Sequence, residues 1–488
     1  MSLSRRDFLK ASGIFLGGAG AVLGQSRSSI RRTPFGGDSP RQKNVVFIVI
    51  DDLNTTLGCY GHRLVQTPHM DALAEMGVRF ENACCNFAVC NPSRSSFLTG
   101  LRPDSTGIFD NKTSFNSMLS GRTTLPRLFR ENGYYTKRLG KVFNGSGDQE
   151  DQLAWDEKGN PGGTSQGKQG TGRNMTDGAL SWCRWLAADG DDEDQSDGNI
   201  AAKAVDFLEG RHNQPFFLAL GFHKPHDPFI APARYFDLYP LEDCEPPEVP
   251  EGWQPLDCLS VPCGTKAIFD QFDDQDRREF LRSYYACTTF VDAQIGKVVQ
   301  GLQDNNLMAD TIIMVFGDHG YHLGEHEWWN KVTVFERCHR SPLIMVVPGE
   351  TPAGDTCHEI VEFVDFFPTL ADLCSLTGAP EDLEGISFRA LLNDPATPWK
   401  EAGYIQVKRG SIFGRAVHTQ RWRYVEWDQG RRGTELYDHD ADPCEYFNLA
   451  DYPEYADQIE YLKNLLHTGQ NRFREPQDAS DDNPSRRV

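Results

Sequence analysis

The feature of this sequence that most limits its possible folds is a pair of continuous apolar runs that each stop at acidic residues. Residues 45–50 are all β-branched or aromatic, and Asp51 and Asp52 follow at once. Residues 311–316 have the same character and lead through a glycine into Asp318. Unbroken apolar runs are typical of strands buried on both faces of a parallel sheet, and such sheets bind ligands at the carboxyl ends of their strands. We therefore predict that the three carboxylates meet at one sheet edge.

Further segments extend this pattern into an α/β fold. Residues 216–220 form a third apolar run, which is followed by His223, Lys224 and His226, and residues 343–347 have the composition of another core strand. Four helical segments alternate with these strands, namely residues 70–76, 125–132, 201–209 and 292–304. Alternating strands and helices predict a large, mixed and mostly parallel sheet that is sandwiched by helices.

The C-terminal part of the chain has a different pattern. Beyond about residue 376 the apolar segments are short and aromatic, as at 422–427 and 435–438, and a helical segment follows at 455–466. We predict a smaller subdomain with a short antiparallel sheet. Two inserted segments, residues 149–197 and 242–266, are rich in Gly, Asp, Pro or Cys and are predicted to be surface loops that frame a cleft, with an acidic turn at 191–194 exposed to solvent.

Net charge limits the possible partners. The chain has 49 Lys and Arg against 70 Asp and Glu, a formal charge of −21. Such a surface repels nucleic acid and anionic membranes at long range, so nucleic-acid binding is disfavoured and an anionic substrate needs a local basic pocket.

The N-terminus has the features of an export signal. Arg5 and Arg6 precede a weakly apolar stretch at residues 11–24 that is too short to span a membrane stably. We interpret this pattern as a twin-arginine (Tat) signal peptide, the alternative being an amphipathic first helix. It predicts an exported bacterial protein, periplasmic or extracellular, with the Tat translocon as a partner. Because that route carries folded proteins from a reducing cytoplasm, few of the 13 cysteines are expected in disulfides, and the sequence assigns no pairing.

The most specific motif is the segment 90–100, Cys-Asn-Pro-Ser-Arg-Ser-Ser-Phe-Leu-Thr-Gly. It resembles the signature of the type I sulfatases, in which Cys-x-Pro-Ser-Arg followed by Leu-Thr-Gly directs oxidation of the cysteine to formylglycine (3-oxoalanine). The resemblance covers nearly the whole chain in the family's order and, within the family, is greatest to the iduronate-2-sulfatases. It implies the alkaline-phosphatase-like sulfatase fold and a formylglycine-generating or sulfatase-maturing enzyme as a partner. The implied divisions are a Tat-type signal peptide (1–27), a flexible tether (28–43), a catalytic sulfatase domain (44–375), a C-terminal subdomain (376–476) and a disordered tail (477–488).

The resemblance also implies a metal site and a set of catalytic residues. A divalent cation would be bound by Asp51, Asp52, oxidised Cys90, Asp318 and His319. This mainly carboxylate set favours a hard ion, which the family indicates is Ca²⁺, with Mg²⁺ left open by composition. The implied catalytic residues are Cys90, Arg94, Lys141, His226 and Lys331, and the implied substrate-binding residues are Lys141, His226, His322 and Lys331.

Each role has a chemical reason. A hydrated aldehyde at position 90 offers two hydroxyls, one to attack sulfur and one whose deprotonation expels sulfate and restores the aldehyde. Lys141 and Lys331 would hold the sulfuryl oxygens, Arg94 would reach back to residue 90 from one helical turn away, and His226 would protonate the departing alcohol.

One position departs from the family pattern. Three residues after the lysine of the Gly-Lys motif, sulfatases have a histidine that helps to deprotonate the diol, and this chain has Asn144. An amide cannot accept a proton at neutral pH. We hypothesise that His322 or metal-ionised water takes over this task, or that the sulfated intermediate breaks down slowly.

The expected substrate is a sulfated saccharide, with a 2-O-sulfated uronate as the leading candidate. Trp328 and Trp329 would pack on a sugar ring or belong to the core, and the cation for the uronate carboxylate is left open among Lys224, Arg340 and Arg415. Two alternatives remain: a phosphoester hydrolase of the same superfamily, and a degenerate sulfatase that acts as a glycan-binding module.

Overall fold

The structure, a computed structural model, describes residues 42–210 and 213–468. The predicted signal peptide (1–27), the tether up to residue 41 and the tail (477–488) lie outside these residues, so they stay predictions. No helix of the described residues is long and apolar enough to cross a membrane.

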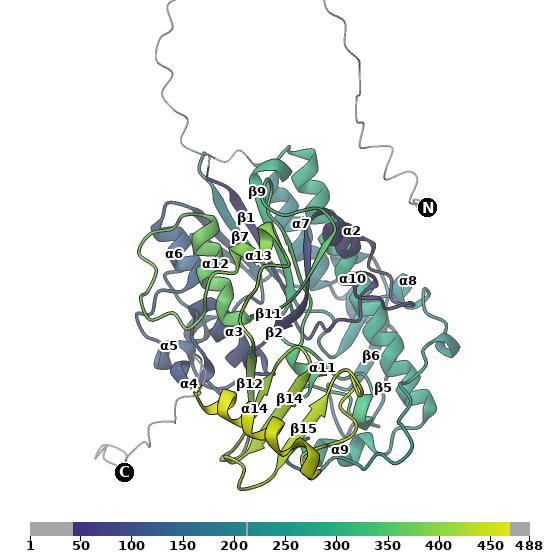
Figure 1. Cartoon of the computed structure of the whole chain (residues 1–488). Helices are drawn as coiled ribbons and strands as arrows, with labels where there is room; N and C mark the ends of the chain where they lie inside the picture. Colours follow the sequence, from purple (N-terminus) through teal and green to yellow (C-terminus); the bar gives the residue numbers. More distant parts are fainter. Residues whose placement is uncertain (1–41, 211–212, 469–488) are drawn as a thin grey trace, which may run out of the picture. The chain divides into compact units, whose positions relative to one another are not determined.

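An eight-stranded mixed sheet forms the centre of the fold (Figure 1). Its strands, in spatial order, are β11 (Asp355–Glu362), β2 (Val78–Cys84), β10 (Leu343–Val346), β9 (Thr311–Gly317), β1 (Asn44–Ile50), β7 (Phe216–Phe222), β3 (Tyr135–Gly140) and β4 (Glu157–Gly159). The five strands from β9 to β4 are parallel to one another, whereas β10 runs antiparallel to both of its neighbours. The predicted fold class, a mostly parallel mixed sheet, is confirmed.

The central strand β1 explains why the apolar runs have no alternation. Val45, Phe47 and Val49 pack on one face of the sheet, and the residues between them pack on the other, so every side chain is buried. The first face is covered by α3 (Cys90–Thr99), α6 (Leu125–Glu131) and α12 (Phe366–Leu373), and the second by α2 (Pro68–Met76), α7 (Ser196–Leu208) and α10 (Asp274–Asp304). These helices flank the sheet in Figure 1.

Helix α10 is longer than the sequence predicted. It begins at a capping box formed by Asp273 and Asp276 and runs for 31 residues, whereas the predicted segment covered only 292–304. Its N-terminal half carries aromatic residues that pack into a cluster away from the large sheet, including Phe280 and Tyr284. Only the second half of α10 has an apolar stripe that faces the strands of the large sheet, so only this half could be recognised as a helix from the sequence.

Part of the predicted loop at 149–197 forms strands. β5 (Gly170–Asn174) and β6 (Arg184–Ala188) lie in this segment and form a small sheet with β8 (Phe229–Pro232), which comes later in the chain; β4 of the large sheet also lies in this segment. Trp185 and Phe229 of this sheet pack against Phe280. Their partners come from distant parts of the chain, so the local composition, rich in Gly and Asp, hid these strands.

The C-terminal subdomain contains the expected antiparallel sheet (Figure 1). Its strands are β12 (Gly403–Arg409), β13 (Ile412–His418), β14 (Trp422–Trp427) and β15 (Thr434–Asp438), with α14 (Ala456–Thr468) packed on one face. The remaining short helices are α4 (Pro103–Thr106), α5 (Phe115–Met118), α8 (Ala233–Phe236), α9 (Cys263–Phe269), α11 (Glu336–His339) and α13 (Arg389–Asn393). The sequence boundary at 375/376 stays a prediction.

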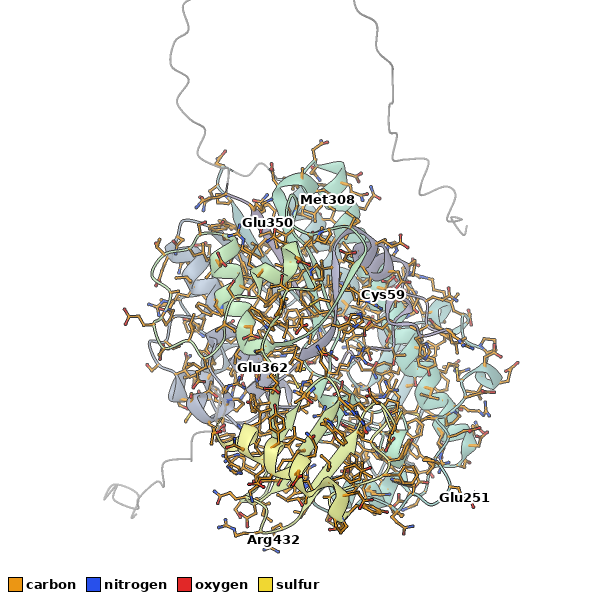
Figure 2. All side chains as sticks on the ribbon, viewed as in Figure 1. Cys59, Glu251, Met308, Glu350, Glu362 and Arg432 are labelled. Atoms are coloured by element: carbon orange, nitrogen blue, oxygen red, sulfur yellow. A yellow bond between two sulfur atoms is a disulfide. The ribbon has the colours of Figure 1, made fainter. Side chains whose placement is uncertain are left out.

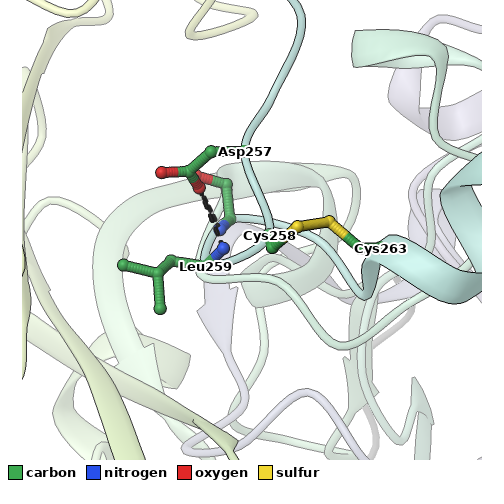
Figure 3. The surroundings of a disulfide bond; sticks show 5 residues. Asp257, Cys258, Leu259 and Cys263 are labelled. Carbon is green, nitrogen blue, oxygen red and sulfur yellow. Dashed lines mark hydrogen bonds between the residues drawn. A yellow bond between two sulfur atoms is a disulfide. The ribbon is translucent and has the colours of Figure 1, made fainter.

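One disulfide is present among the described residues. Cys258 and Cys263 close a short loop just before and at the start of α9, and in the same turn the Leu259 amide donates to Asp257 at 2.9 Å (Figure 3). This pair lies in the inserted segment 242–266, for which the sequence assigned no pairing.

Candidate active site

The parallel register brings the predicted carboxylates together. Residue 50 of β1 lies opposite Phe222 of β7 and Gly317 of β9, so the residues after these strands emerge side by side. The Asp51 amide donates to the Phe222 carbonyl at 3.1 Å, and the Asp318 amide donates to the Ile50 carbonyl at 3.1 Å. Three strands with one direction thus place polar groups at one edge.

Asp52 turns the chain sharply at this edge. Its φ of 63° lies in the left-handed region, which Asp tolerates better than most residues. Its amide donates to Asp318 Oδ1 at 2.9 Å, and its carbonyl accepts from the Tyr284 hydroxyl at 2.7 Å. These two bonds fix the carboxylate in a fully buried position.

Cys90 is the first residue of α3, a helix whose ten residues are all buried. Lys331 Nζ donates to Cys90 Sγ at 3.2 Å, and His319 Nε2 lies 3.5 Å from the same sulfur. The positive end of a helix and a buried ammonium both favour an anionic group at this position.

Arg94 holds two of the carboxylates from the second turn of α3. Its Nη2 lies 2.8 Å from Asp51 Oδ1 and its Nε lies 2.9 Å from Asp318 Oδ2. It also donates to the carbonyls of Lys141 and Val142. The fork of the guanidinium therefore fixes Asp51 and Asp318 relative to the helix that presents Cys90, rather than pointing toward a bound anion.

Two glycines allow Lys141 to reach the site. Gly140 ends β3 at a φ of 76°. The backbone amide of the next residue, Lys141, donates to the Gly221 carbonyl at 2.9 Å. A Cβ on Gly221 would lie 2.0 Å from the Lys141 carbonyl oxygen. This close approach directs Lys141 Nζ to within 2.7 Å of Asp51 Oδ2.

Neighbouring charges shift the protonation of these groups. Burial raises the pKa of Asp51, but Lys141 and Arg94 outweigh it and hold that pKa well below its usual range. Burial likewise opposes ionisation of Cys90, yet Lys141 and Lys331 bring the pKa of the thiol well below the ordinary value. The site therefore stabilises negative charge at residue 90.

The same residues are suited to bind a divalent cation. Asp52 Oδ2 is a buried oxygen with no hydrogen-bond partner, and Asp52, Cys90 and His319 form one of the groups whose ligand atoms lie within 4.8 Å of one another. The His319 Nδ1–H donates to the Gly320 carbonyl at 2.9 Å, which leaves Nε2 with a lone pair toward the site. With Asp51 and the Asp318 carboxylate beside them, these donors are of the kind that a hard cation takes.

His226 and its neighbour complete the site. His226 Nε2 lies 3.8 Å from Asp52 Oδ2, and its Nδ1 donates to the Asp227 carbonyl. Burial lowers the pKa of His226, but Asp52 raises it to about 10. Asp227, which sequence reasoning missed, groups with His226 and Asp52; its position directly after His226 was the only available signal. Nothing in the sequence pointed to Tyr284, which holds Asp52 from the middle of α10.

His322 does not join this group of residues. It is fully buried, its Nε2 pairs with Thr333 Oγ1 at 2.9 Å, and its Nδ1 pairs with the Glu325 carbonyl at 3.3 Å. Burial takes the pKa of His322 well below its usual value, so the ring is neutral. The geometry gives no support to its expected roles in substrate binding or proton transfer.

The aromatic residues proposed for sugar packing belong to the core. Trp328 and Trp329 are 1% and 2% exposed and pack with Phe269, Phe272 and Phe280. Their apolar neighbours come from α9 and α10, which the sequence did not place next to them.

The three cations considered for a uronate carboxylate already have partners. Lys224 Nζ donates to the carbonyls of His226 and Pro228, Arg340 pairs with Glu81, and Arg415 Nη2 lies 3.0 Å from Asp104 Oδ1. The acidic turn at 191–194 is also less exposed than predicted, because Asp192 pairs with Arg234 and Lys297.

This fold, with a buried cysteine at a helix start beside clustered carboxylates and lysines, defines an ester hydrolase of the alkaline-phosphatase-like class. The sulfatase family model matches residues 43–376, and a model described as N-sulphoglucosamine sulphohydrolase, C-terminal, matches residues 324–472. The chain belongs to the sulfatase family and is an enzyme of that family.

Individual relatives agree with this assignment. A sulfatase from Formosa agariphila is 32% identical over 460 residues, covering 87% of this chain and 86% of the relative. Human iduronate 2-sulfatase is 31% identical, covering 86% of this chain and 93% of the relative. A solved phosphonate monoester hydrolase from Silicibacter pomeroyi superposes with a TM-score of 0.72 at 21% identity, covering 87% of this chain and 94% of that one, which shows the shared fold.

Proposed function

We propose that the protein removes sulfate from a sulfated saccharide, with a 2-O-sulfated uronate as its substrate class. The observation that carries the proposal is the position of Cys90, which contacts Lys331 and His319 and groups with Asp52. The likeness to human iduronate 2-sulfatase over most of both chains supports the uronate.

The residues of this chain would act as follows. The charges of Lys141 and Lys331 both act on residue 90, and the two lysines would hold sulfuryl oxygens as their charge develops. His226, which Asp52 keeps protonated at neutral pH, would donate a proton to the leaving sugar oxygen. Arg94 would keep the carboxylates in place while the substrate binds.

Two groups would complete the chemistry. Residue 90 as formylglycine would supply a geminal diol, the nucleophile that an unmodified thiol does not replace in a sulfatase. A divalent cation, proposed to be Ca²⁺, would supply charge neutralisation and a lower pKa for a hydroxyl bound to it; Asp51, Asp52, Asp318, His319 and residue 90 would hold it.

The export of this protein is also a proposal. The twin-arginine pattern at Arg5 and Arg6 supports a periplasmic or extracellular location, reached by the Tat translocon after a maturing enzyme has oxidised Cys90 in the cytoplasm. Mass spectrometry of the exported protein tests this order of events: only unmodified Cys90 in that protein would contradict it.

Sulfate release by matured protein tests the substrate class. The panel holds 2-sulfated uronate disaccharides, 4- and 6-sulfated hexosamine counterparts, and a phosphonate monoester, with Cys90→Ala protein as the blank. We expect selective release from the 2-sulfated uronates. Release from a hexosamine sulfate alone would keep the reaction and contradict the uronate, and turnover of the phosphonate alone would favour a phosphoester hydrolase. Tight sugar binding with no turnover would favour a glycan-binding module.

Metal removal tests the cation site separately. We expect about one Ca²⁺ per chain by elemental analysis, loss of activity with chelator, and recovery with Ca²⁺. Asp52→Asn should lose the bound metal, because it removes the charge of a carboxylate whose Oδ2 has no hydrogen-bond partner. Asp451→Asn, the same substitution at an exposed position, is the control. Metal retained by Asp52→Asn would contradict the assignment.

A further inference from the structure

The first hairpin of the C-terminal sheet lies next to the segment that leads into Cys90. Gln406 of β12 forms an isolated parallel bridge with Phe87, and its amide donates to the Asn86 carbonyl at 3.2 Å. Phe87 is three residues before the nucleophile. Lys408 lies two residues further along β12 and is therefore on the same side of the molecule as the start of α3.

Lys408 also contacts two aromatic rings, one of which comes from a turn near the start of α3. Its Nζ lies 5.4 Å from the ring centroid of Phe109 and 5.3 Å from that of Phe413, and the two rings are 5.1 Å apart. Phe109 begins a turn whose Asn111 side chain accepts from the Asn91 amide at 3.0 Å, directly after Cys90. The cation thus rests on two half-buried rings beside the reactive residue.

Lys408 forms no ion pair with any carboxylate of residues 42–210 and 213–468. Asp110 is the carboxylate whose charge interacts with that of Lys408. Its Oδ1 accepts from the amides of Lys112 and Thr113 and from the Thr113 hydroxyl. Among the six exposed lysines of the described residues, Lys158 and Lys203 pair with carboxylates, whereas Lys408 is the one that rests on aromatic rings. A cation held on aromatic rings without a counter-ion is well placed for an external anion.

We propose that Lys408, with Phe109 and Phe413, forms a subsite for a second anionic group of the substrate. The two rings would pack on an apolar face of a sugar, and the ammonium would pair with its carboxylate or with a sulfate of the adjoining residue. This inference rests on the proposed function and adds a substrate class to it: saccharides with a further negative charge beside the scissile sulfate. Lys408 then takes the role of the second cation that was left open among Lys224, Arg340 and Arg415, which all have partners within the protein.

Binding measurements on full-length Cys90→Ala protein test the subsite without turnover. The probe is a 2-O-sulfated uronate disaccharide, compared with the same disaccharide whose carboxylate is reduced to an alcohol and with one that carries an added 6-sulfate on the hexosamine. Lys408→Met should weaken binding of the ligand that carries the recognised anion about tenfold, the effect of losing one charge-assisted contact. Lys408→Arg should retain most of the affinity, and Lys463→Met, an exposed lysine on α14, should match the parent protein.

The ligand series identifies the anion. If the carboxylate is bound, the reduced disaccharide should bind equally to Lys408→Met and the parent; if the sulfate is bound, the loss should be confined to the 6-sulfated ligand. Equal affinities of Lys408→Met and Lys463→Met for every ligand would overturn the subsite. Matured wild type that releases sulfate while affinity is independent of Lys408 contradicts the subsite alone. Binding that depends on Lys408 without any sulfate release contradicts the proposed function alone.

Discussion

At the scale of single residues, a left-handed backbone conformation occurs at either end of one ion pair, that of Asp52 and Lys331. Asp52 has a φ of 63° and Val332 a φ of 72°, and for a β-branched residue this region is a true outlier. Lys331, the neighbour of Val332, pairs with Asp52 and contacts Cys90. Strain of this kind costs about 1–3 kcal/mol and persists only where other contacts enforce it. Here those contacts hold the lysine against the nucleophile.

A residue-scale prediction concerns Asn144, which is half-buried and donates to the Asn111 carbonyl at 3.1 Å. We expect Asn144→His to raise kcat by about tenfold, because an imidazole can assist deprotonation of the diol and general-base assistance is commonly worth about 10²–10⁴-fold. The sulfated form of residue 90, observed by intact mass during turnover, should decrease in parallel. Asn393→His, an exposed change on α13, is the control. A wild type without accumulated intermediate and a variant no faster than it would refute the idea that this position limits the rate.

At the scale of elements, the C-terminal sheet supports the turn that carries Lys331. Arg409 at the end of β12 donates to the Val332 carbonyl and, at 3.0 Å, to the Ser260 carbonyl of the disulfide-closed loop. Burial lowers the pKa of Arg409 to about 10, and its guanidinium lies 5.8 Å from the Trp427 ring. One arginine thus connects three segments: β12, the loop that Cys258 and Cys263 close, and the strained turn after Lys331.

We expect Arg409→Met to lower kcat about tenfold with little change in KM, since it frees the Val332 carbonyl and loosens the adjacent lysine. A misplacement of about 1 Å at a catalytic group can cost about 10²-fold. Arg409→Lys should recover part of the rate by donating to the same carbonyl. Arg432→Met, an exposed change after β14 (Figure 2), is the matched control. A melting temperature that falls while kcat holds would show that Arg409 serves stability only.

At the scale of the whole molecule, a buried carboxylate joins the large sheet to the C-terminal sheet. Glu362 at the end of β11 accepts from both Nη atoms of Arg102 at 2.7 Å, from Lys400 Nζ at 2.8 Å and from the Tyr404 amide of β12 at 3.1 Å. Burial opposes its ionisation, but Arg102 and Lys400 bring the pKa of Glu362 down to about 2. Replacing Glu362 removes the carboxylate that both Nη atoms of the buried Arg102 contact, whereas Lys400 keeps its pair with Asp365.

We expect Glu362→Gln to lower the free energy of unfolding by about 3–5 kcal/mol at neutral pH. Because the folded pKa lies below the unfolded value near 4.3, this stabilisation is fully present above that value and is lost as the pH falls toward about 2. Denaturant unfolding of both proteins across this range measures the difference. Glu350→Gln, which breaks a more exposed pair with Arg389, should cost less than about 1 kcal/mol (Figure 2). A difference that stays constant with pH would contradict the ionic origin.

The sequence by itself determined the strands of the sheet centre and the chemistry at their ends. Residues 45–50 and 311–316 are apolar throughout because both faces of the sheet are covered, and this local signal survives without knowledge of partners. The motif after Cys90 determined the family in the same way, since its residues are contiguous. The long first half of α10 and the strands near Trp185 were missed because their patterns depend on contacts distant in the chain. The disulfide joins cysteines only five residues apart, and it was missed because the export pattern predicted few disulfides.

Only the tertiary structure decided which polar residues face the site. His322 and Trp328 lie close to Asp318 in the sequence, yet both are buried with partners elsewhere: His322 pairs with Thr333 and the Glu325 carbonyl, and Trp328 packs on Phe269 of α9. Tyr284 and Arg409 reach the site from distant elements and carry no local signature. Composition and spacing specify which chemistry a chain can perform, whereas the direction of each side chain depends on packing among segments that are far apart in the sequence.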